Sequence, residues 1–163
     1  MTNTAPTTPA EQPTGYDTQA VEAWIRQHVT GLTPPLTWIR LQGGHSNLTY
    51  RLRDAQGREA VIRRPPMGEL LAMAHDMARE WSVISALAGT AVPVPPALGF
   101  CDDPSVTGAR FYVMGLIDGR PLYTADDTKR LVPEAQRTRL AHSFIDVLAD
   151  LHSVDPDTVG LGS

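Results

Sequence analysis

The pattern of hydrophobic and polar residues from 48 to 63 predicts two β-strands joined by a tight turn. In residues 48–53 every second side chain is apolar, which is the two-residue period of a strand with one buried face. Residues 54–58 are typical of a turn, and Gly57 stands where a positive φ is often required. Residues 59–63 resume an extended run. Leu48, Tyr50 and Leu52 share one face of the first strand; in the second strand Ala60 and Ile62 lie on one face and Val61 and Arg63 on the other.

A period near 3.6 residues predicts three helices elsewhere in the chain. The first begins after Asp17, a residue type suited to the N-cap, and ends at Gly31, a typical helix stop. The second spans residues 73–87 and the third spans residues 140–152, each with one apolar face. The apolar positions are Met73, Met77, Ile84 and Leu87 in the second helix and Leu140, Phe144, Val147, Leu148 and Leu151 in the third.

Three further extended runs, residues 36–41, 97–101 and 110–114, are bounded by Pro-rich and Gly-rich turns. Together with the hairpin they give five strands, so we expect an α+β fold with a five-stranded antiparallel sheet and the 73–87 helix packed on it. Residues 123–133 are polar and acidic with little periodicity, and we expect an irregular, mobile connection there.

The composition predicts a globular protein in a reducing compartment. The chain has 163 residues, of which 42% are hydrophobic, enough to bury a core in one domain or in part of a larger one. Its formal net charge of −4 argues against a nucleic-acid or membrane partner, since both require a basic face. A single cysteine, Cys101, excludes an internal disulfide and favours the cytoplasm. Residues 1–15 are expected to be a disordered leader.

Two features carry candidate chemistry. Gly43 and Gly44 precede the hairpin, and a glycine turn between a strand and a hairpin that ends in a cation is a candidate phosphate cradle. From these residues alone, a tight turn between two strands is the alternative. Glu80 lies on the apolar face of the second helix, where a carboxylate requires a partner, and Arg63 or Arg64 is the nearest cation by topology. The alternative is an exposed Glu80 that pairs with Arg79 or with solvent.

Other polar residues are assigned structural roles. The five histidines lack the spacing of a zinc site, and Cys101 beside two aspartates is expected to be a buried structural thiol. The acidic pairs, Asp102 with Asp103, Asp126 with Asp127 and Asp146 with Asp150, are expected to be solvated carboxylates.

Six stretches of this sequence resemble the amino-terminal lobe of the protein-kinase-like fold and, more narrowly, the aminoglycoside phosphotransferase family. They are GGHSNLTYRL at 43–52, VIRRPP at 61–66, REWSVISAL at 79–87, VPVPPALGFCDD at 92–103, FYVMGLIDGRPL at 111–122 and LADLH at 148–152. Within that family they are most similar to the branch found beside or fused to acyl-CoA dehydrogenases. This resemblance implies a hydroxyacyl-CoA or related hydroxylated metabolite as the acceptor.

The resemblance also implies a nucleotide site for ATP. The backbone of Gly43, Gly44, His45 and Ser46 would cover the phosphates, Arg63 would hold the α- and β-phosphates, and Glu80 would orient Arg63. Val61 would lie against the adenine with Met114 behind the base, and the backbone of Gly115 and Ile117 would bond its edge. At Gly115 side chains are expected to vary freely, because the main chain makes the contact. If Arg63 points elsewhere, the alternative register uses Arg64 and Ile62.

Residues 16–122 would then form the amino-terminal lobe with its hinge, and residues 123–163 the start of a second lobe. No H-G-D-x-x-x-x-N loop occurs before Ser163, so no catalytic residue or Mg²⁺ ligand is assigned within these residues. We therefore expect this chain alone to bind ATP weakly, to lack activity, and to self-associate through an uncovered apolar face. The alternative is a non-catalytic nucleotide-binding or protein-interaction module, which Arg63 in place of the commoner lysine favours.

Overall fold

The protein is an α+β unit built on one antiparallel sheet. The computed structural model describes residues 12–41, 47–68 and 76–162. The five strands are β1 (Thr37–Arg40), β2 (Leu48–Arg53), β3 (Glu59–Arg64), β4 (Ala97–Cys101) and β5 (Phe111–Gly115). They lie in the order β1-β2-β3-β5-β4, and every neighbouring pair is antiparallel. The predicted fold class and sheet are confirmed, and Gly57 adopts the expected positive φ of 81° in the β2–β3 turn.

The strand register gives the sheet two chemically different faces. Tyr50, Ile62 and Val113 are cross-strand neighbours on one face. One residue along each strand, Val61 pairs with Met114 on the opposite face. Because side chains alternate along a strand, the register separates an apolar core face from a face with polar side chains.

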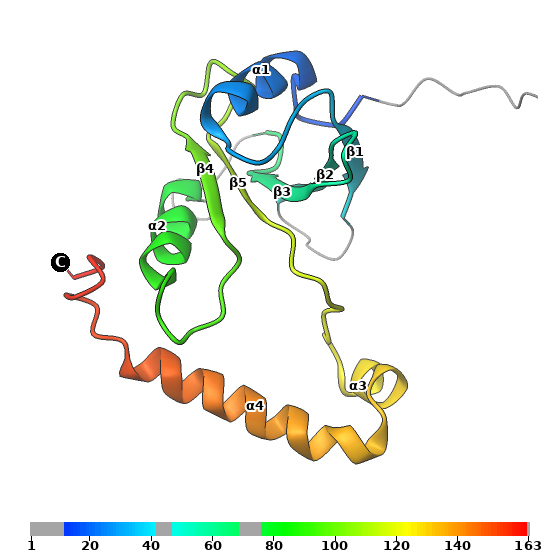
Figure 1. Ribbon diagram of the computed structural model, residues 1–163, viewed down its shortest axis with the longest axis vertical. Helices are drawn as coiled ribbons and strands as arrows, with labels where there is room; N and C mark the ends of the chain where they lie inside the picture. The colour runs from blue at the N-terminus through cyan, green and yellow to red at the C-terminus, as the bar shows by residue number, and fades with distance from the viewer. Residues whose placement is uncertain (1–11, 42–46, 69–75, 163) are drawn as a thin grey trace, which may run out of the picture.

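Helix α1 (Thr18–His28) covers the apolar face of the sheet (Figure 1). Its predicted N-cap is confirmed, since the Asp17 side chain accepts a hydrogen bond from the Ala20 backbone N–H at 3.0 Å. Val21 and Ile25 on α1 are fully buried, and burial of each such side chain stabilises the fold by about 1.5–3 kcal/mol. The core beneath them consists of Leu48, Tyr50, Leu52, Ala60, Ile62, Cys101, Phe111 and Val113.

Helix α2 (Met77–Leu87) packs on β4 and β5 at the edge of the sheet (Figure 1). Its first turn is capped by the Asp76 side chain, which accepts hydrogen bonds from the backbone N–H groups of Ala78 and Arg79. The helix was expected to start at Met73, but that residue lies outside the described part of the chain, and the described helix starts at residue 77 because Asp76 caps it.

Two predictions for the carboxyl-terminal quarter are wrong. The expected irregular connection contains α3 (Ala125–Leu131), a short helix stabilised by a capping box between Thr124 and Asp127 rather than by an apolar face. The next helix, α4 (Glu134–Ser153), begins six residues before the predicted residue 140. Its first turn lacks the apolar period but follows Pro133, a residue that is well tolerated where helices begin.

Helix α4 carries no buried residue along its length. Figure 1 shows α3 and α4 set apart from the sheet at the end of an extended segment that follows β5. Four of the five apolar side chains predicted for one face of α4, Leu140, Phe144, Leu148 and Leu151, are therefore exposed, and the fifth, Val147, is half-buried. Among the described residues, none of the helices has the length and apolar character needed to cross a membrane.

Candidate functional site

An ion pair between the sheet and α2 forms the centre of the candidate site. Arg63 Nε on β3 lies 3.0 Å from Glu80 Oε2 on α2. Strand alternation places Arg63 on the face opposite α1, and the packing of α2 on β4 and β5 brings the first turn of that helix over the same face. Both side chains keep about a third of their surface exposed. The pairing expected from the sequence is therefore present, at a position that solvent and small molecules can reach.

Two further side chains hold the Glu80 carboxylate. The Tyr112 hydroxyl donates a hydrogen bond to Glu80 Oε2 at 2.9 Å, and the Asn47 amide donates one to Oε1 at 3.3 Å. Sequence analysis did not single out either residue. The sheet register makes Tyr112 the direct neighbour of Arg63, but this follows only once β3 and β5 are known to pair. Asn47 lies directly before β2, so its contact connects the start of that strand to α2.

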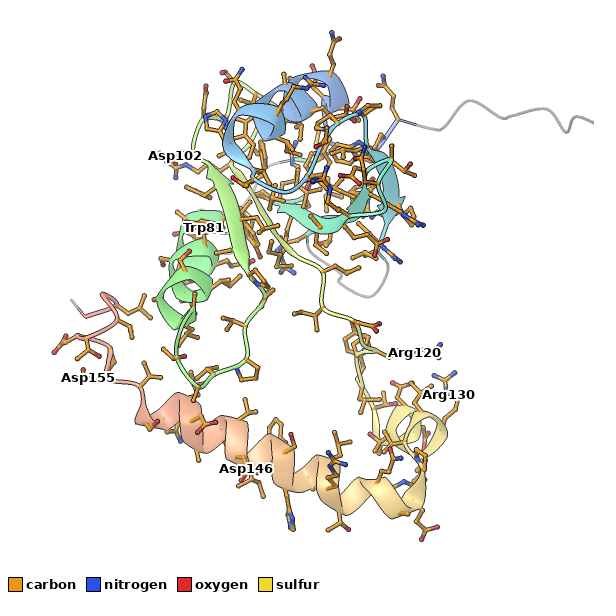
Figure 2. All side chains as sticks on the ribbon, viewed as in Figure 1. Trp81, Asp102, Arg120, Arg130, Asp146 and Asp155 are labelled. Atoms are coloured by element: carbon orange, nitrogen blue, oxygen red, sulfur yellow. The ribbon has the colours of Figure 1, made fainter. Side chains whose placement is uncertain are left out.

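Tyr112 is fixed by its surroundings. Its side chain is 2% exposed, and burial together with the neighbouring Glu80 charge raises the pKa of its hydroxyl above the usual range. The hydroxyl therefore stays protonated and remains a donor. The Trp81 ring lies 6.2 Å from the Tyr112 ring and stacks on Phe100 of β4, at the junction of α2 and the sheet (Figure 2).

Arg64 has a different role from Arg63. It lies on the core face with 4% exposure, and its guanidinium donates to the backbone carbonyls of Gly15 and Thr107 and lies over the Tyr16 ring. Burial lowers the pKa of Arg64, and the backbone carbonyl of Pro65 also accepts a hydrogen bond from its Nε. The alternative register, in which Arg64 and Ile62 replace Arg63 and Val61, is therefore excluded by the geometry.

Apolar residues lie beside the ion pair on the same face. Val61, two residues before Arg63, pairs across the strands with Met114. A cleft of about 500 Å³ extends from this point along α2. Its lining residues are Arg63, Arg79, Glu80, Val83, Ile84, Pro95, Tyr112 and Met114. The cleft thus combines apolar walls with a fixed cation, an arrangement that suits a ligand with an anionic group and a flat or aliphatic part.

The predicted hinge begins at Gly115 but differs from the prediction in one respect. A side chain was expected to be free to vary here, yet a Cβ at Gly115 would lie 2.8 Å from Pro96 Cδ. The Gly115 N–H also donates to the Pro96 carbonyl at 2.8 Å. The position is therefore restricted by the segment before β4, and its N–H is already engaged. Ile117, further along the same segment, is 61% exposed.

A second cleft of about 640 Å³ lies between the β2–β3 hairpin and residues 116–119. The Arg51–Glu59 ion pair lines it together with Leu41 and Ile117. Arg51 is the cross-strand neighbour of Val61, so both clefts open on the sheet face opposite α1. This face therefore presents a continuous set of polar and apolar groups from α2 to the hinge.

Not all predicted site residues fall within the described part of the chain. Gly43, Gly44, His45 and Ser46 lie outside the described residues. In the part of the chain that the structure describes, no three His, Cys, Asp or Glu side chains gather in a way that suits a metal ion. Cys101 is buried as expected, and burial raises the pKa of its thiol, which opposes a nucleophilic role.

Comparison with known proteins identifies the family. The model of the phosphotransferase enzyme family matches residues 37–163, which include the whole sheet, α2 and α4. The chain belongs to this family. The residues that match include the ion pair and both clefts, so the site lies within the family domain.

Similar proteins agree with the predicted branch of the phosphotransferase family. The chain is 36% identical over 151 residues to rat acyl-CoA dehydrogenase family member 11, covering 90% of this chain and 19% of the relative. It is 34% identical over 158 residues to mouse acyl-CoA dehydrogenase family member 10, covering 96% of this chain and 14% of the relative. The chain therefore spans less than a fifth of the length of these curated relatives.

A solved structure supports the fold. The crystal structure of a candidate aminoglycoside phosphotransferase from Ralstonia eutropha JMP134 superposes with a TM-score of 0.73 at 37% sequence identity. The match covers 90% of this chain and 41% of that protein. The kinase-like fold predicted from the sequence is confirmed by this neighbour.

Proposed function

We propose that this phosphotransferase-family chain is the nucleotide-binding part of an ATP-dependent enzyme that phosphorylates a hydroxyl group of a small molecule. The observation that carries the proposal is the Arg63–Glu80 pair at 3.0 Å on the sheet face that also carries Val61 and Met114. A cation held by a carboxylate beside an apolar surface matches the needs of a polyphosphate joined to a flat base.

Each residue of the site has a proposed task. Arg63 binds the α- and β-phosphates, and Glu80 keeps its guanidinium in place. Val61 and Met114 contact the adenine. The N–H of Gly115 is already bonded to Pro96, so other backbone atoms between Gly115 and Ile117 bond the base edge. The backbone of residues 43–46 covers the phosphates.

Arg63 changes how phosphate is bound compared with the lysine common in kinase-like sites. A guanidinium is planar and binds two oxygens at once, whereas an ammonium acts as a compact point charge. The Glu80 contact uses Nε of Arg63. We propose that Arg63 binds phosphate oxygens while its Nε keeps the contact with Glu80.

The remaining parts of the proposal concern groups outside this site. We propose that Mg²⁺ neutralises the phosphates and is held by residues that this chain does not supply. The acceptor is proposed to be a hydroxyacyl-CoA or related metabolite, on the ground of the acyl-CoA dehydrogenase relatives. The reducing cytoplasm is the proposed compartment, because the chain has a single cysteine and it is buried.

We further propose that residues 16–122 are the nucleotide lobe and that α4 belongs to a second lobe. The 163 residues contain no H-G-D-x-x-x-x-N sequence, so the chain alone is proposed to bind ATP without transferring phosphate. In this state its exposed α4 face pairs with a second copy of the chain.

Nucleotide binding by the 163-residue chain tests the proposal directly. Mg-ATP, added to uniformly ¹⁵N-labelled protein, is expected to shift the amide signals of Val61, Arg63 and Met114 and to bind with a Kd above the micromolar range. Arg63→Ala is expected to weaken ATP binding roughly tenfold, since it removes a charged hydrogen-bonding partner. Arg53→Ala, which removes an exposed arginine of the β2–β3 hairpin, is the matched control and is expected to bind like the parent protein.

Two outcomes would contradict the proposal. If ATP shifts no signal on this face at millimolar concentration, the site is not a nucleotide site, and an interaction module becomes the better assignment. The second outcome concerns the full-length protein. If it binds ATP but phosphorylates no hydroxylated metabolite in a screen with ATP labelled at the γ-phosphate, it is a non-catalytic nucleotide-binding module.

A further inference from the structure

We infer that Tyr112 is a positioning residue of the nucleotide site, which acts on bound phosphate through Glu80 and Arg63. This inference rests on the proposed function. It concerns a residue to which the proposed function gives no contact with the base or the phosphates, but which holds the carboxylate that orients Arg63.

The first argument is the geometry of the Glu80 carboxylate. Oε2 receives both the Tyr112 hydroxyl at 2.9 Å and Arg63 Nε at 3.0 Å. A carboxylate on a single helix can rotate about its side-chain torsions, and a salt bridge with a third of its surface exposed restricts that rotation only weakly. The hydrogen bond from Tyr112 adds a second, charge-assisted anchor at the same oxygen.

The second argument is that this anchor is rigid. Tyr112 lies in β5 directly beside Arg63 of β3 and is almost fully buried. Its ring is held against Trp81, which stacks on Phe100 of the edge strand (Figure 2). The Tyr112 hydroxyl is therefore fixed relative to the sheet, and Glu80 is carried by α2. Their hydrogen bond fixes α2 relative to the strand that carries Arg63.

The third argument concerns the other carboxylate oxygen. Asn47, which lies directly before β2, donates a hydrogen bond to Glu80 Oε1 at 3.3 Å. With Tyr112 on one oxygen and Asn47 on the other, the carboxylate plane has a defined orientation. Arg63 consequently meets a fixed acceptor rather than a mobile one, which lowers the entropy lost when phosphate binds.

The inference predicts a selective loss in the variant Tyr112→Phe, which removes only the hydroxyl. Binding of Mg-ATP is expected to weaken roughly fivefold, because one charge-assisted hydrogen bond that orders the Arg63 pair is lost. Binding of adenosine is expected to stay unchanged, because adenosine lacks the phosphates that Arg63 would hold. A purely structural role for Tyr112 would weaken both ligands alike.

Tyr50→Phe provides the matched control. Tyr50 is also buried in the sheet, and its hydroxyl accepts a hydrogen bond from Arg40 on the opposite, core face. Its loss is expected to lower the unfolding temperature without changing either Kd. Comparing the two variants separates a general cost of removing a buried hydroxyl from a specific cost at the site.

A double-mutant cycle completes the test. In a Glu80→Ala background, Tyr112→Phe is expected to have no further effect on ATP binding, since its route of action is gone. Additive losses in the two variants would overturn the inference, as would equal ATP affinity of Tyr112→Phe and the parent. Failure of the proposed function would look different: ATP would bind neither the parent chain nor any variant on this face.

Discussion

Arg63 and Arg64 are neighbours in sequence but lie on opposite faces of the sheet with opposite tasks. Arg63 meets Glu80 on the accessible face, and Arg64 is buried against backbone carbonyls and the Tyr16 ring on the core face. The two-residue period of β3 produces this division. One arginine is thus available to a ligand while the other holds the segment around Gly15 and the loop at Thr107 to the sheet.

This division predicts different effects on stability. Arg64→Met is expected to lower the free energy of unfolding by about 3 kcal/mol, because it leaves buried carbonyl groups without a donor. Arg63→Met is expected to cost about 1 kcal/mol or less, because its ion pair is partly exposed. Urea unfolding at pH 7 measures both values. Equal costs for the two variants would contradict the assignment of roles.

Gly115 is predicted to be intolerant of a side chain. Its Cβ would lie 2.8 Å from Pro96 Cδ, and a proline ring moves less easily than the end of a flexible chain. Gly115→Ala is therefore expected to cost about 1–3 kcal/mol of unfolding free energy. Gly119→Ala, where no atom lies within 4 Å of the added Cβ, is the control and is expected to change stability by less than about 0.5 kcal/mol. A neutral Gly115→Ala would show that the segment before β4 shifts freely.

Asp54 is predicted to make the free energy of unfolding decrease as the pH becomes acidic. Burial raises the pKa of its carboxyl, but hydrogen bonds from the Arg58 and Thr33 backbone N–H groups and from the Arg58 side chain outweigh it and hold the pKa below the usual range. Because the folded-state pKa is lowered, the ionised Asp54 carboxylate stabilises the protein fully above about pH 4. The protein loses this stabilisation as the pH falls through the folded-state pKa.

The measurement is chemical unfolding between about pH 6 and pH 3 for the parent chain and for Asp54→Asn. As the pH falls below about 4, the parent is expected to lose stability more steeply than the variant, so that the gap between the two curves narrows. Asp146→Asn, an exposed carboxylate on α4, is the control and is expected to follow the parent. Parallel curves for the parent and Asp54→Asn would contradict the prediction.

Helix α4 is predicted to pair with α4 of a second copy of the chain. Its exposed apolar positions, Leu140, Phe144, Leu148 and Leu151, recur at helical spacing. The charges favour an antiparallel pair: residues 129–139 hold four of the basic side chains, whereas residues 140–163 hold four aspartates and no lysine or arginine. Figure 2 shows Arg130 on α3, Asp146 along α4 and Asp155 beyond the far end of α4.

Sedimentation velocity tests this pairing. The parent chain is expected to form dimers at micromolar concentration, and Phe144→Glu is expected to remain monomeric because it places a charge within the apolar face. His142→Glu places the same charge on the other side of the helix and is the matched control, expected to dimerise. A monomeric parent chain would exclude self-association and leave the α4 face available to another segment or partner.

Much of the fold follows from short-range patterns in the sequence. Alternation identified the strands and assigned Val61 and Arg63 to one face, and Asp17 identified the start of α1, because these features depend on residues a few positions apart. Helix α3 was missed because its stabilising signal is the Thr124–Asp127 capping box and not an apolar period. The family resemblance indicated Arg63 and Glu80 as partners.

Only the tertiary structure decided the features that join distant segments. The Tyr112 hydroxyl reaches Glu80 because β5 pairs with β3 and α2 packs on β5. Local periodicity predicts neither of these two contacts between elements. Pro96 restricts Gly115 for the same reason, although the family resemblance implied a permissive position. The spacing of hydrophobic residues determines which face of a strand or helix a side chain occupies. The atoms that the side chain contacts there depend on how the elements pack, because close packing depends on the shapes of all buried side chains together.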